Sequence, residues 1–317
     1  MKRFLLPLMI AFAALAFTAC SEDIFGVEEM DQTRATTTVS LKVMQYNVKS
    51  ARPVETSGHE WSKRKAAIAA YIKKEAPDVI AVQELYNGWT MNQYSQLNSL
   101  ISSVYGGYIA YRGTTTVWDN EGCAIFYKKS RFSLVKTGKF WLSATPDKES
   151  KGWGGEYKRV TAWAILKDKT TAKEFFVIST HFEDWVQKDG NNGNCQYEST
   201  KVINARIKSL AGGRNVILMG DFNSNPDKTP AKMLQKKWGQ GGTLVNARDI
   251  CRINPSGNKY TTNNWDTADN TGAQFDYVMI TDNGANYVSS HYTGNSYYNS
   301  VMMSDHNPVI VDAKFVY

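Results

Sequence analysis

The sequence contains few of the residues that form zinc or redox centres. Its 317 residues include only four cysteines and four histidines, with no Cys-x-x-Cys pair. Without that spacing, a zinc or redox site is not expected. Beyond the first twenty residues three cysteines remain, Cys123, Cys195 and Cys251. In an oxidising compartment two of them can form one disulfide, and the sequence does not select which two.

Long hydrophobic runs are scarce as well. An apolar stretch near the N-terminus runs from Phe4 to Phe17, which is shorter than the roughly 20 residues that a membrane-spanning helix needs. Because Lys2 and Arg3 precede this stretch, the pattern predicts a secretion signal over residues 1–20.

The end of this signal, Phe17-Thr18-Ala19-Cys20, resembles the lipobox of bacterial lipoproteins, whose cleavage leaves a lipid-modified cysteine at the N-terminus. The resemblance implies that Cys20 is a lipid anchor, which holds the protein in the bacterial cell envelope, at the outer membrane or the cell surface. An ordinary signal peptide with an incidental cysteine is the alternative.

Runs of five or more lysines and arginines are absent too, so the sequence contains no dedicated nucleic-acid patch. Loss of Lys2 and Arg3 with the signal lowers the number of basic residues from 37 to 35 against 30 acidic ones, and the formal charge from +7 to +5. A charge of this size suits an anionic substrate or plain solubility equally well.

Residues 21–40 lack sustained hydrophobic periodicity and are rich in acidic residues and threonine. This composition predicts a flexible tether with a typical end-to-end distance of ~25 Å. With 42% hydrophobic residues in the whole sequence and no internal repeat, residues 41–317 are long enough to form a domain with a sizeable core.

Helical and extended patterns interleave along this domain. Helices are expected near residues 61–75, 91–104 and 197–210, and strands near residues 41–48, 79–82, 108–111, 123–127, 132–135, 160–166, 175–180, 216–219, 275–280, 287–290 and 308–315. Because single strands alternate with runs of adjacent strands, the order favours a layered α/β sandwich with mixed sheets over a strictly parallel βαβ fold.

Polar residues lie beside many of these strands. The apolar run Val216–Met219 stops at Gly220, and Asp221 and Asn223 follow on one side of the chain while Phe222 points to the other. Taken singly, such residues are often turns or caps. The same relation recurs at several other strands, at Asn47, Glu84, His181, Asp276, Asp305 and His306. This recurrence predicts one shared site.

The motifs around these residues identify a resemblance to a known family. They read Gln45-Tyr46-Asn47, Val82-Gln83-Glu84, Ser179-Thr180-His181, Gly220-Asp221-Phe222-Asn223, Phe275-Asp276-Tyr277 and Ser304-Asp305-His306-Asn307-Pro308. Together they resemble the endonuclease/exonuclease/phosphatase superfamily over roughly residues 41–317. The resemblance implies a four-layer α/β/β/α sandwich, in which two mixed β-sheets pack face to face with helices outside, and an active site on one rim.

The resemblance also implies a metal ion. Mg²⁺ is usually held by one or two carboxylates together with substrate phosphate and water, which matches Glu84, assisted by Asp305 and Asn47. We therefore expect Mg²⁺ as the cofactor, with Mn²⁺ able to replace it.

The remaining motif residues are expected to act on the phosphoester. By resemblance, Asp221 orients or activates the attacking water, Asn223 contacts the phosphate, and His306 paired with Asp276 stabilises the transition state. His181 is expected to be a second imidazole that faces the phosphate.

Arg159 begins the predicted strand 160–166, near a position where the family often has a phosphate-contacting arginine. A solvated charge at the strand end is the alternative.

The substrate is predicted from the positive charge near the motifs. A phosphomonoester presents more negative charge than a phosphodiester and benefits from more fixed cations. Only Arg159 and the two imidazoles could be assigned to the site, so a Mg²⁺-dependent, nuclease-like phosphodiesterase is expected, acting as a monomer. A phosphomonoesterase, a phospholipid- or sphingomyelin-directed hydrolase, and a non-catalytic surface binding module that keeps the fold are the alternatives. The pattern typical of inositol polyphosphate phosphatases is absent.

Overall fold

The computed structural model describes residues 36–52, 56–89, 91–113, 120–184, 192–268 and 272–317. The predicted signal peptide, Cys20 and most of the predicted tether lie outside this part of the chain. Within it, no helix is both long and apolar enough to cross a membrane. Cys123, Cys195 and Cys251 are all free thiols, so the disulfide that the sequence left open is not formed.

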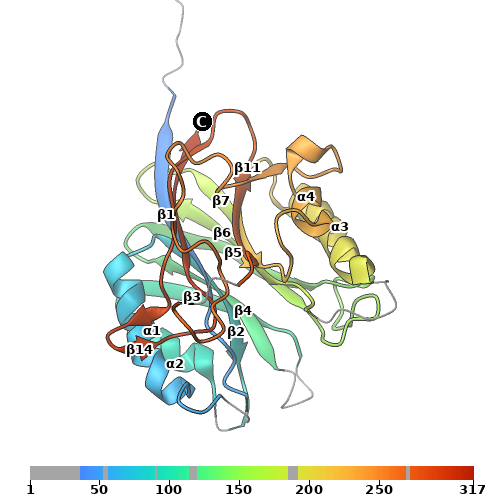
Figure 1. The fold of residues 1–317 in the computed structure, drawn as a ribbon. Coiled ribbons are helices and arrows are strands. Elements are labelled where there is room, and N and C mark those ends of the chain that lie inside the picture. Colours follow the sequence, from blue (N-terminus) through green and yellow to red (C-terminus); the bar gives the residue numbers. More distant parts are fainter. Residues whose placement is uncertain (1–35, 53–55, 90, 114–119, 185–191, 269–271) are drawn as a thin grey trace, which may run out of the picture. The chain divides into compact units, whose positions relative to one another are not determined.

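Two large mixed β-sheets form the centre of the domain (Figure 1). The seven-stranded sheet has the order β10 (Ser256–Gly257), β12 (Tyr287–Thr293), β15 (Val309–Val316), β1 (Thr38–Asn47), β2 (Val79–Tyr86), β4 (Glu121–Lys128) and β3 (Tyr105–Tyr111). The six-stranded sheet has the order β5 (Phe132–Trp141), β6 (Val160–Asp168), β7 (Glu174–His181), β8 (Asn215–Asp221), β11 (Asp276–Thr281) and β9 (Leu244–Asn246). A small hairpin joins β13 (Tyr297–Tyr298) and β14 (Val301–Met302).

The two sheets pack face to face because successive side chains along each strand point to opposite faces of the sheet, and both faces are apolar. Val43 of β1 lies in the core that both sheets share, whereas its neighbour Met44 lies in a second core on the outer face. Val177 and Ile217 enter the shared core from the six-stranded sheet. Complete burial of each such side chain contributes roughly 1.5–3 kcal/mol, so this shared core is the main contact that holds the sheets together.

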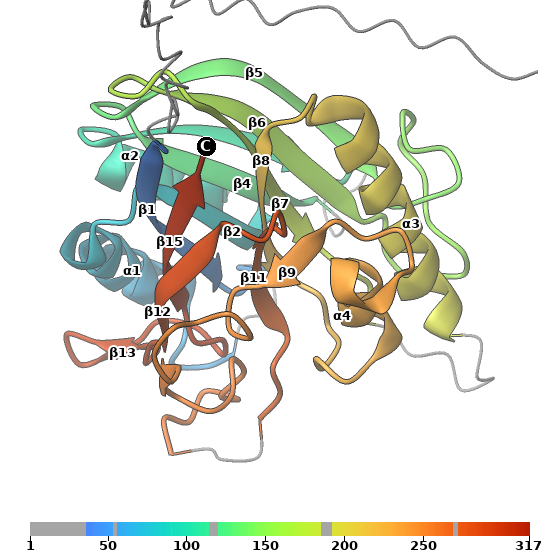
Figure 2. The same cartoon turned by 90° about the horizontal axis from the view of Figure 1, so that it is seen from above.

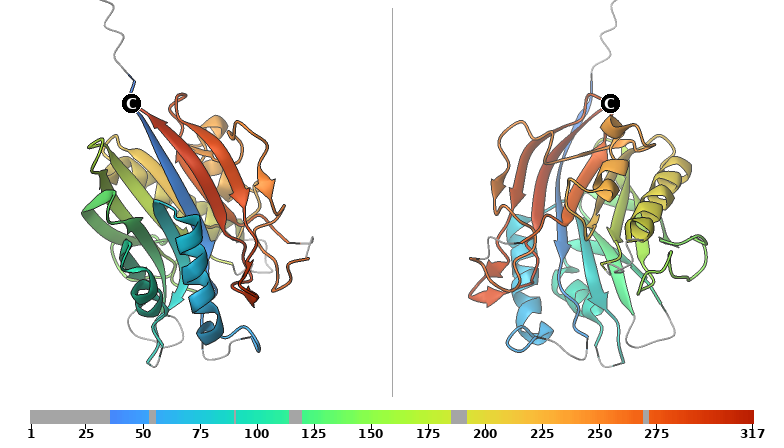
Figure 3. Two further views of the ribbon diagram at one scale, coloured as in Figure 1. Left: turned by 90° about the vertical axis from the view of Figure 1, so that its left-hand side faces the viewer. Right: turned by 45° about the vertical axis from the view of Figure 1, so that its right-hand side comes forward.

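Helices cover the outer faces of both sheets, as Figures 2 and 3 show. The seven-stranded sheet is covered by α1 (Trp61–Glu75) and α2 (Gln93–Ile101), and Ile68 and Leu97 lie in the core on that side. The six-stranded sheet is covered by α3 (Asn192–Leu210) and the short α4 (Thr229–Met233), which is followed by the 3-10 turn η2 (Lys236–Trp238). The predicted α/β/β/α sandwich is confirmed.

Strand register brings the predicted site residues to one rim. β7 and β8 are parallel and place His181 beside Asp221. β11 is antiparallel to β8, so its first residue, Asp276, pairs with the last residue of β8, Asp221. In the other sheet the parallel pair β1 and β2 places Asn47 beside Gln83, which precedes Glu84.

Most predicted boundaries differ from the structure, those of β1 and α3 among them. β1 begins at Thr38 rather than Leu41, because Thr38 and Val39 pair with the C-terminal strand at Val316 and Phe315. α3 begins at Asn192 rather than near residue 197, so this helix is longer than predicted. The elements not predicted, α4, η2, β9, β10, β13 and β14, have at most five residues each, too few to show a periodic pattern.

Candidate active site

Glu84 reaches the rim through an irregularity in β2. Its backbone φ is 62°, in the left-handed region, and the pairing of β2 with β4 shifts register between Val82 and Leu85. A bulge of this kind adds a residue and redirects a side chain, and positive φ in a non-glycine residue is uncommon. The strand continues to Tyr86 instead of ending before Gln83, and the bulge gives Glu84 its direction.

Glu84 is held by neighbouring donors. Asn47 Nδ2 donates to Glu84 Oε1 at 2.9 Å, and the backbone N–H of Ser50 donates to Glu84 Oε2 at 2.9 Å. Burial by itself would raise the pKa of Glu84, but the charge of Lys49, followed by the Asn47 hydrogen bond and the charge of His306, holds this pKa well below its ordinary value. Glu84 is therefore an anion at neutral pH.

Asp221 lies at the rim, between side chains that come from the two sheets. Its Oδ2 accepts a hydrogen bond of 3.0 Å from Asn47 Nδ2, and it lies 3.5 Å from His181 Nε2 and 3.8 Å from His306 Nε2. Burial, followed by the repulsion of Asp276, raises the pKa of Asp221 to about 7 against the opposing effect of His306. A carboxylate with its pKa in this range can both take up and release a proton near neutral pH.

Asp276 and His306 form a buried pair. Asp276 Oδ2 lies 2.8 Å from His306 Nδ1, and Gln45 Nε2 donates to Asp276 Oδ1 at 3.1 Å. Burial lowers the pKa of His306, but Asp276 and then Asp221 outweigh it and raise the pKa to about 10. His306 is therefore an imidazolium at neutral pH, with Nε2 directed toward Asp221.

His181 has the opposite charge state. Burial and the neighbouring Arg159 hold its pKa well below the ordinary value, so the ring is neutral. Asn223 Nδ2 lies 3.1 Å from His181 Nε2, and an amide nitrogen can only donate. The neutral ring therefore carries its proton on Nδ1.

The local backbone explains why Asn223 can make this contact. Its φ is 46°, a left-handed conformation that asparagine tolerates better than most residues. Its backbone N–H donates to Asp221 Oδ1 at 2.8 Å, as in an Asx turn. The turn that was the alternative explanation of this motif is thus the structure that aligns Asp221 and Asn223.

A divalent cation fits one group of these residues by its donor chemistry. Glu84, His181 and Asp221 each offer a ligand atom, and the three atoms lie within 4.8 Å of one another. Carboxylate oxygens are the donors that hard cations such as Mg²⁺ prefer. Asp221, Asp276 and His306 form a second group of the same size, in which His306 Nδ1 already bonds Asp276 Oδ2 at 2.8 Å.

Asp305 is near the site but has a different partner. Its Oδ2 lies 2.8 Å from Lys49 Nζ, and neither metal-compatible group found in the described residues includes it. The proposed metal role of Asp305, like that of Asn47, stays a prediction.

Arg159 lies at the site and is not a solvated charge at the end of a strand. It is 4% exposed and lines an open cavity of about 190 Å³ together with Glu84 and His181. Its Nη2 donates to the buried Glu183 at 3.0 Å and to the half-exposed Asp184. Its buried Nε has no hydrogen-bond partner within the described chain.

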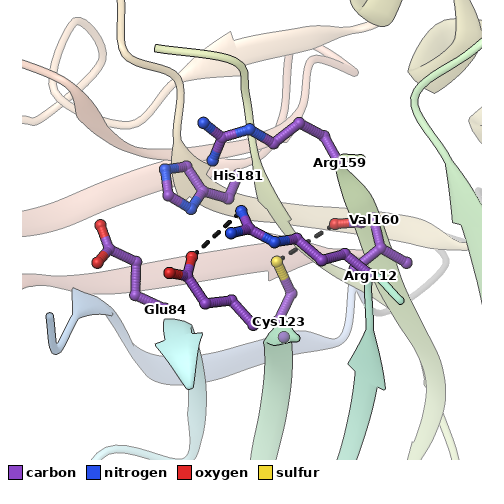
Figure 4. Close-up of a pocket in the computed structure, with 8 residues that line it drawn as sticks. Glu84, Arg112, Cys123, Arg159, Val160 and His181 are labelled. Carbon is purple, nitrogen blue, oxygen red and sulfur yellow. Dashed lines mark hydrogen bonds and ion pairs between the residues drawn. The ribbon is translucent and has the colours of Figure 1, made fainter. Parts of the chain in front are cut away.

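The sequence did not single out several other residues around this cavity. Lys49, Arg52, Glu121 and Tyr157 line it as well. Arg52 pairs with Glu121, which also pairs with Arg112 at 3.2 Å. Figure 4 shows Arg112, just after β3, and Arg159, just before β6, extending toward His181 from the two sheets, with Glu84 facing the same space. These residues lie in loops or at strand ends and are far apart in the sequence. No sequence pattern therefore indicates that they share one cavity.

Two buried glutamines support the site from below, and sequence reasoning passed over them. Gln45 and Gln83 hydrogen-bond to each other, and Gln83 Nε2 donates to Ser179 Oγ at 3.1 Å. They tie the two sheets together beneath the rim. Alternation could have identified Gln45, because it shares a face of β1 with Asn47.

Comparison with known proteins agrees with this geometry. The model of the Endonuclease/Exonuclease/phosphatase family matches residues 44–158. A solved family member from Bacteroides thetaiotaomicron is 26% identical, with a TM-score of 0.75 over 88% of this chain and 99% of that one. The mannosyl-6-phosphatase of the same species is also 26% identical, with a TM-score of 0.72 over 87% of this chain and 100% of that one.

The chain is therefore similar to this family in sequence over residues 44–158 and shares the fold of its solved members over most of its length. Nocturnin from Drosophila melanogaster is a more distant relative, 25% identical over 173 residues, which make up 52% of this chain and 24% of nocturnin. The chain thus aligns with about a quarter of that relative's length. These matches agree with the resemblance that the motifs indicate.

Proposed function

We propose that the protein is a Mg²⁺-dependent hydrolase of phosphoesters. The observation that carries this proposal is the rim arrangement of an anionic Glu84, a neutral His181, an Asp221 with a raised pKa, and a protonated His306. A bound Mg²⁺, held by Glu84, would neutralise phosphate charge.

In this proposal the chain's own groups move the proton and stabilise charge. Asp221 Oδ2 accepts the proton of the attacking water, because its raised pKa matches that task. The Nε2–H of His306 points to the same place and stabilises negative charge that builds on the phosphate. Asp276 keeps His306 protonated and fixes its ring through Nδ1.

We favour a phosphomonoester over the phosphodiester expected from the sequence. That expectation rested on Arg159 as the one assignable guanidinium, but Arg52 and Lys49 line the same cavity, beside the carboxylates of Glu84, Glu121 and Asp184. Additional fixed cations favour the more highly charged monoester. The similarity to a mannosyl-6-phosphatase supports a phosphorylated sugar as the first candidate.

Initial rates on matched substrates test the proposal. We expect hydrolysis of hexose 6-phosphates to exceed that of single-stranded DNA, RNA and sphingomyelin, to stop in EDTA and to return with Mg²⁺ or Mn²⁺. A clear preference for any diester would reject the monoester assignment. Full activity in EDTA would reject the metal.

Substitutions separate metal binding from phosphate binding. Glu84→Gln should raise the Mg²⁺ concentration needed for half-maximal rate, whereas Arg52→Gln should raise KM and change that concentration little. Arg206→Gln is a matched control, because Arg206 pairs with the exposed Asp147 outside the cavity.

The lipid anchor also remains a proposal, supported by the motif that ends at Cys20. Metabolic labelling with a radioactive fatty acid should mark the wild-type chain but not Cys20→Ser. Equal labelling of both would reject the anchor.

A further inference from the structure

A cavity of about 10 Å³ lies beside Asp276 and is lined by strands of both sheets. Its lining combines Asp276 and Tyr277 of the six-stranded sheet with His291 and Thr293 of the seven-stranded sheet. The described part of its wall also includes the polar side chains of Asn246 and Thr261. None of the proposed roles at the rim uses His291 or Thr293.

Two polar atoms in this lining lack a partner within the described chain. His291 Nδ1 and Thr293 Oγ1 are buried and make no hydrogen bond there. The residues themselves are 5% and 1% exposed, and they lie two apart on the same face of β12. Buried polar atoms are nearly always hydrogen-bonded, to protein or to ordered water.

The size and polarity of the cavity match a single water molecule. A water needs roughly 10–15 Å³ of accessible space and two to four polar partners. His291 Nδ1 and Thr293 Oγ1 supply two partners. Burial, with the nearby positive charge of Arg248, lowers the pKa of His291 to about 4, so its ring is neutral and Nδ1 can accept or donate according to its tautomer.

Asp276 can take part in the same hydrogen-bond network. Its carboxylate accepts from His306 through Oδ2 and from Gln45 through Oδ1, and a carboxylate has about four acceptor positions. Its backbone N–H is fixed separately by Thr261 Oγ1 at 3.0 Å. A water molecule in the cavity could donate a third hydrogen bond to the Asp276 carboxylate and so fix its orientation.

We propose that an ordered water in this cavity links His291 and Thr293 to Asp276, and that the two residues thereby position the Asp276–His306 pair. His291 and Thr293 are positioning residues in this network, because they reach the reacting groups only through Asp276. The kinetic part rests on the proposed hydrolase function, whereas the water site does not.

A crystal structure of the wild-type protein tests the water directly. We expect electron density for one water within hydrogen-bond distance of His291 Nδ1, Thr293 Oγ1 and Asp276. Thr293→Val keeps the shape of the side chain but removes the hydroxyl, and it should weaken or displace this density. A dry cavity, or a water that does not contact Asp276, would overturn the proposal even if the protein proves to have no hydrolase activity.

Kinetics test the positioning role. Thr293→Val and His291→Gln should lower kcat about three- to thirtyfold with little change in KM, and the glutamine should retain more activity than His291→Leu. In an Asp276→Asn background, Thr293→Val should cost nothing further, because its effect passes through Asp276. Independent, multiplicative losses would show a general structural role and contradict the proposal.

A control on the same strand separates this effect from damage to β12. Ser290 hydrogen-bonds Asp312 at 2.6 Å and does not line the cavity. Ser290→Ala should leave kcat unchanged, and thermal unfolding should show that each variant is folded at the assay temperature. If Ser290→Ala lowered kcat as much as Thr293→Val, the effect would belong to the strand and not to the water.

Discussion

His306 lies between two carboxylates, with Nδ1 2.8 Å from Asp276 Oδ2 and Nε2 3.8 Å from Asp221 Oδ2. The closer, fully buried carboxylate keeps the ring charged, and the more distant one lies where a reacting water would be placed. This asymmetry fits the different tasks that the family resemblance implies for the two aspartates.

Removing the charge of Asp276 should therefore act through His306. We expect Asp276→Asn to lower kcat by ~10²–10⁴-fold, the usual range for a positioned proton-transfer group, because the pKa of His306 falls and its ring orientation is lost. The double variant with His306→Ala should be little worse than either single one. Asp147→Asn, at an exposed position, is the control; near wild-type kcat in Asp276→Asn would contradict the assignment.

The pH profile of kcat/KM should report the ionisation of Asp221 and His306. Asp221 must be ionised to accept a proton, so kcat/KM should rise through a midpoint at or below about 7, since a cation bound nearby lowers the pKa of a carboxylate. His306 must stay protonated, so activity should fall only as the pH approaches about 10. Asp276→Asn should move the alkaline limb to lower pH. An alkaline limb that does not move in this variant would remove His306 as its source.

Most of the central fold could be predicted because its elements are long and regular. α1 was predicted with the bounds that the structure shows, Trp61–Glu75, since its apolar positions recur with the helical period and Pro77 follows its end. The site residues on strands were found because each follows or begins an apolar run. Register then brought His181, Asp221 and Asp276 together.

The cavity's cations could not be predicted for a physical reason. Arg52, Arg112 and Arg159 come from three separate segments, and all three guanidinium groups lie about 5 Å from the ring of Tyr157, at 5.0, 4.7 and 5.2 Å. Such a cluster depends on how loops fold over the rim, and no period in the sequence records it. The bulge at Glu84 is likewise a tertiary feature that changes where the side chain points.

Arg64 should be the most sensitive single support of the loop that follows β1. It is buried on α1 and donates to four backbone carbonyl groups, those of Val48, Lys49, His59 and Met303. Each buried acceptor left unsatisfied costs about 1–3 kcal/mol, so Arg64→Met should lower the free energy of unfolding by at least about 3 kcal/mol.

Urea unfolding of this variant measures the effect. Lys63→Met, at an exposed neighbouring position on the same helix, is the matched control and should change stability by less than about 0.5 kcal/mol. A loss below about 1 kcal/mol in Arg64→Met would show that water replaces these hydrogen bonds.

Asp184 should compete with substrate phosphate for Arg159. Its carboxylate contacts Arg159 Nη2 while its side chain is 56% exposed, and it lines the open cavity. Burial first, and then repulsion by Glu183, raises the pKa of Asp184 although Arg159 opposes both. An anion held under this repulsion is more easily displaced than Glu183, whose side chain is 1% exposed.

Asp184→Asn should therefore free Arg159 for the phosphate, lowering KM and the inhibition constant of inorganic phosphate about two- to tenfold while kcat changes little. The neutral amide keeps the size of the side chain, so the effect isolates its charge. Glu183→Gln is the contrasting variant. Because Glu183 also accepts from the backbone N–H of Tyr157 at 2.9 Å, its loss should lower thermal stability and raise KM. A higher KM in Asp184→Asn would mean that Asp184 contacts the substrate itself, and the competition would then be rejected.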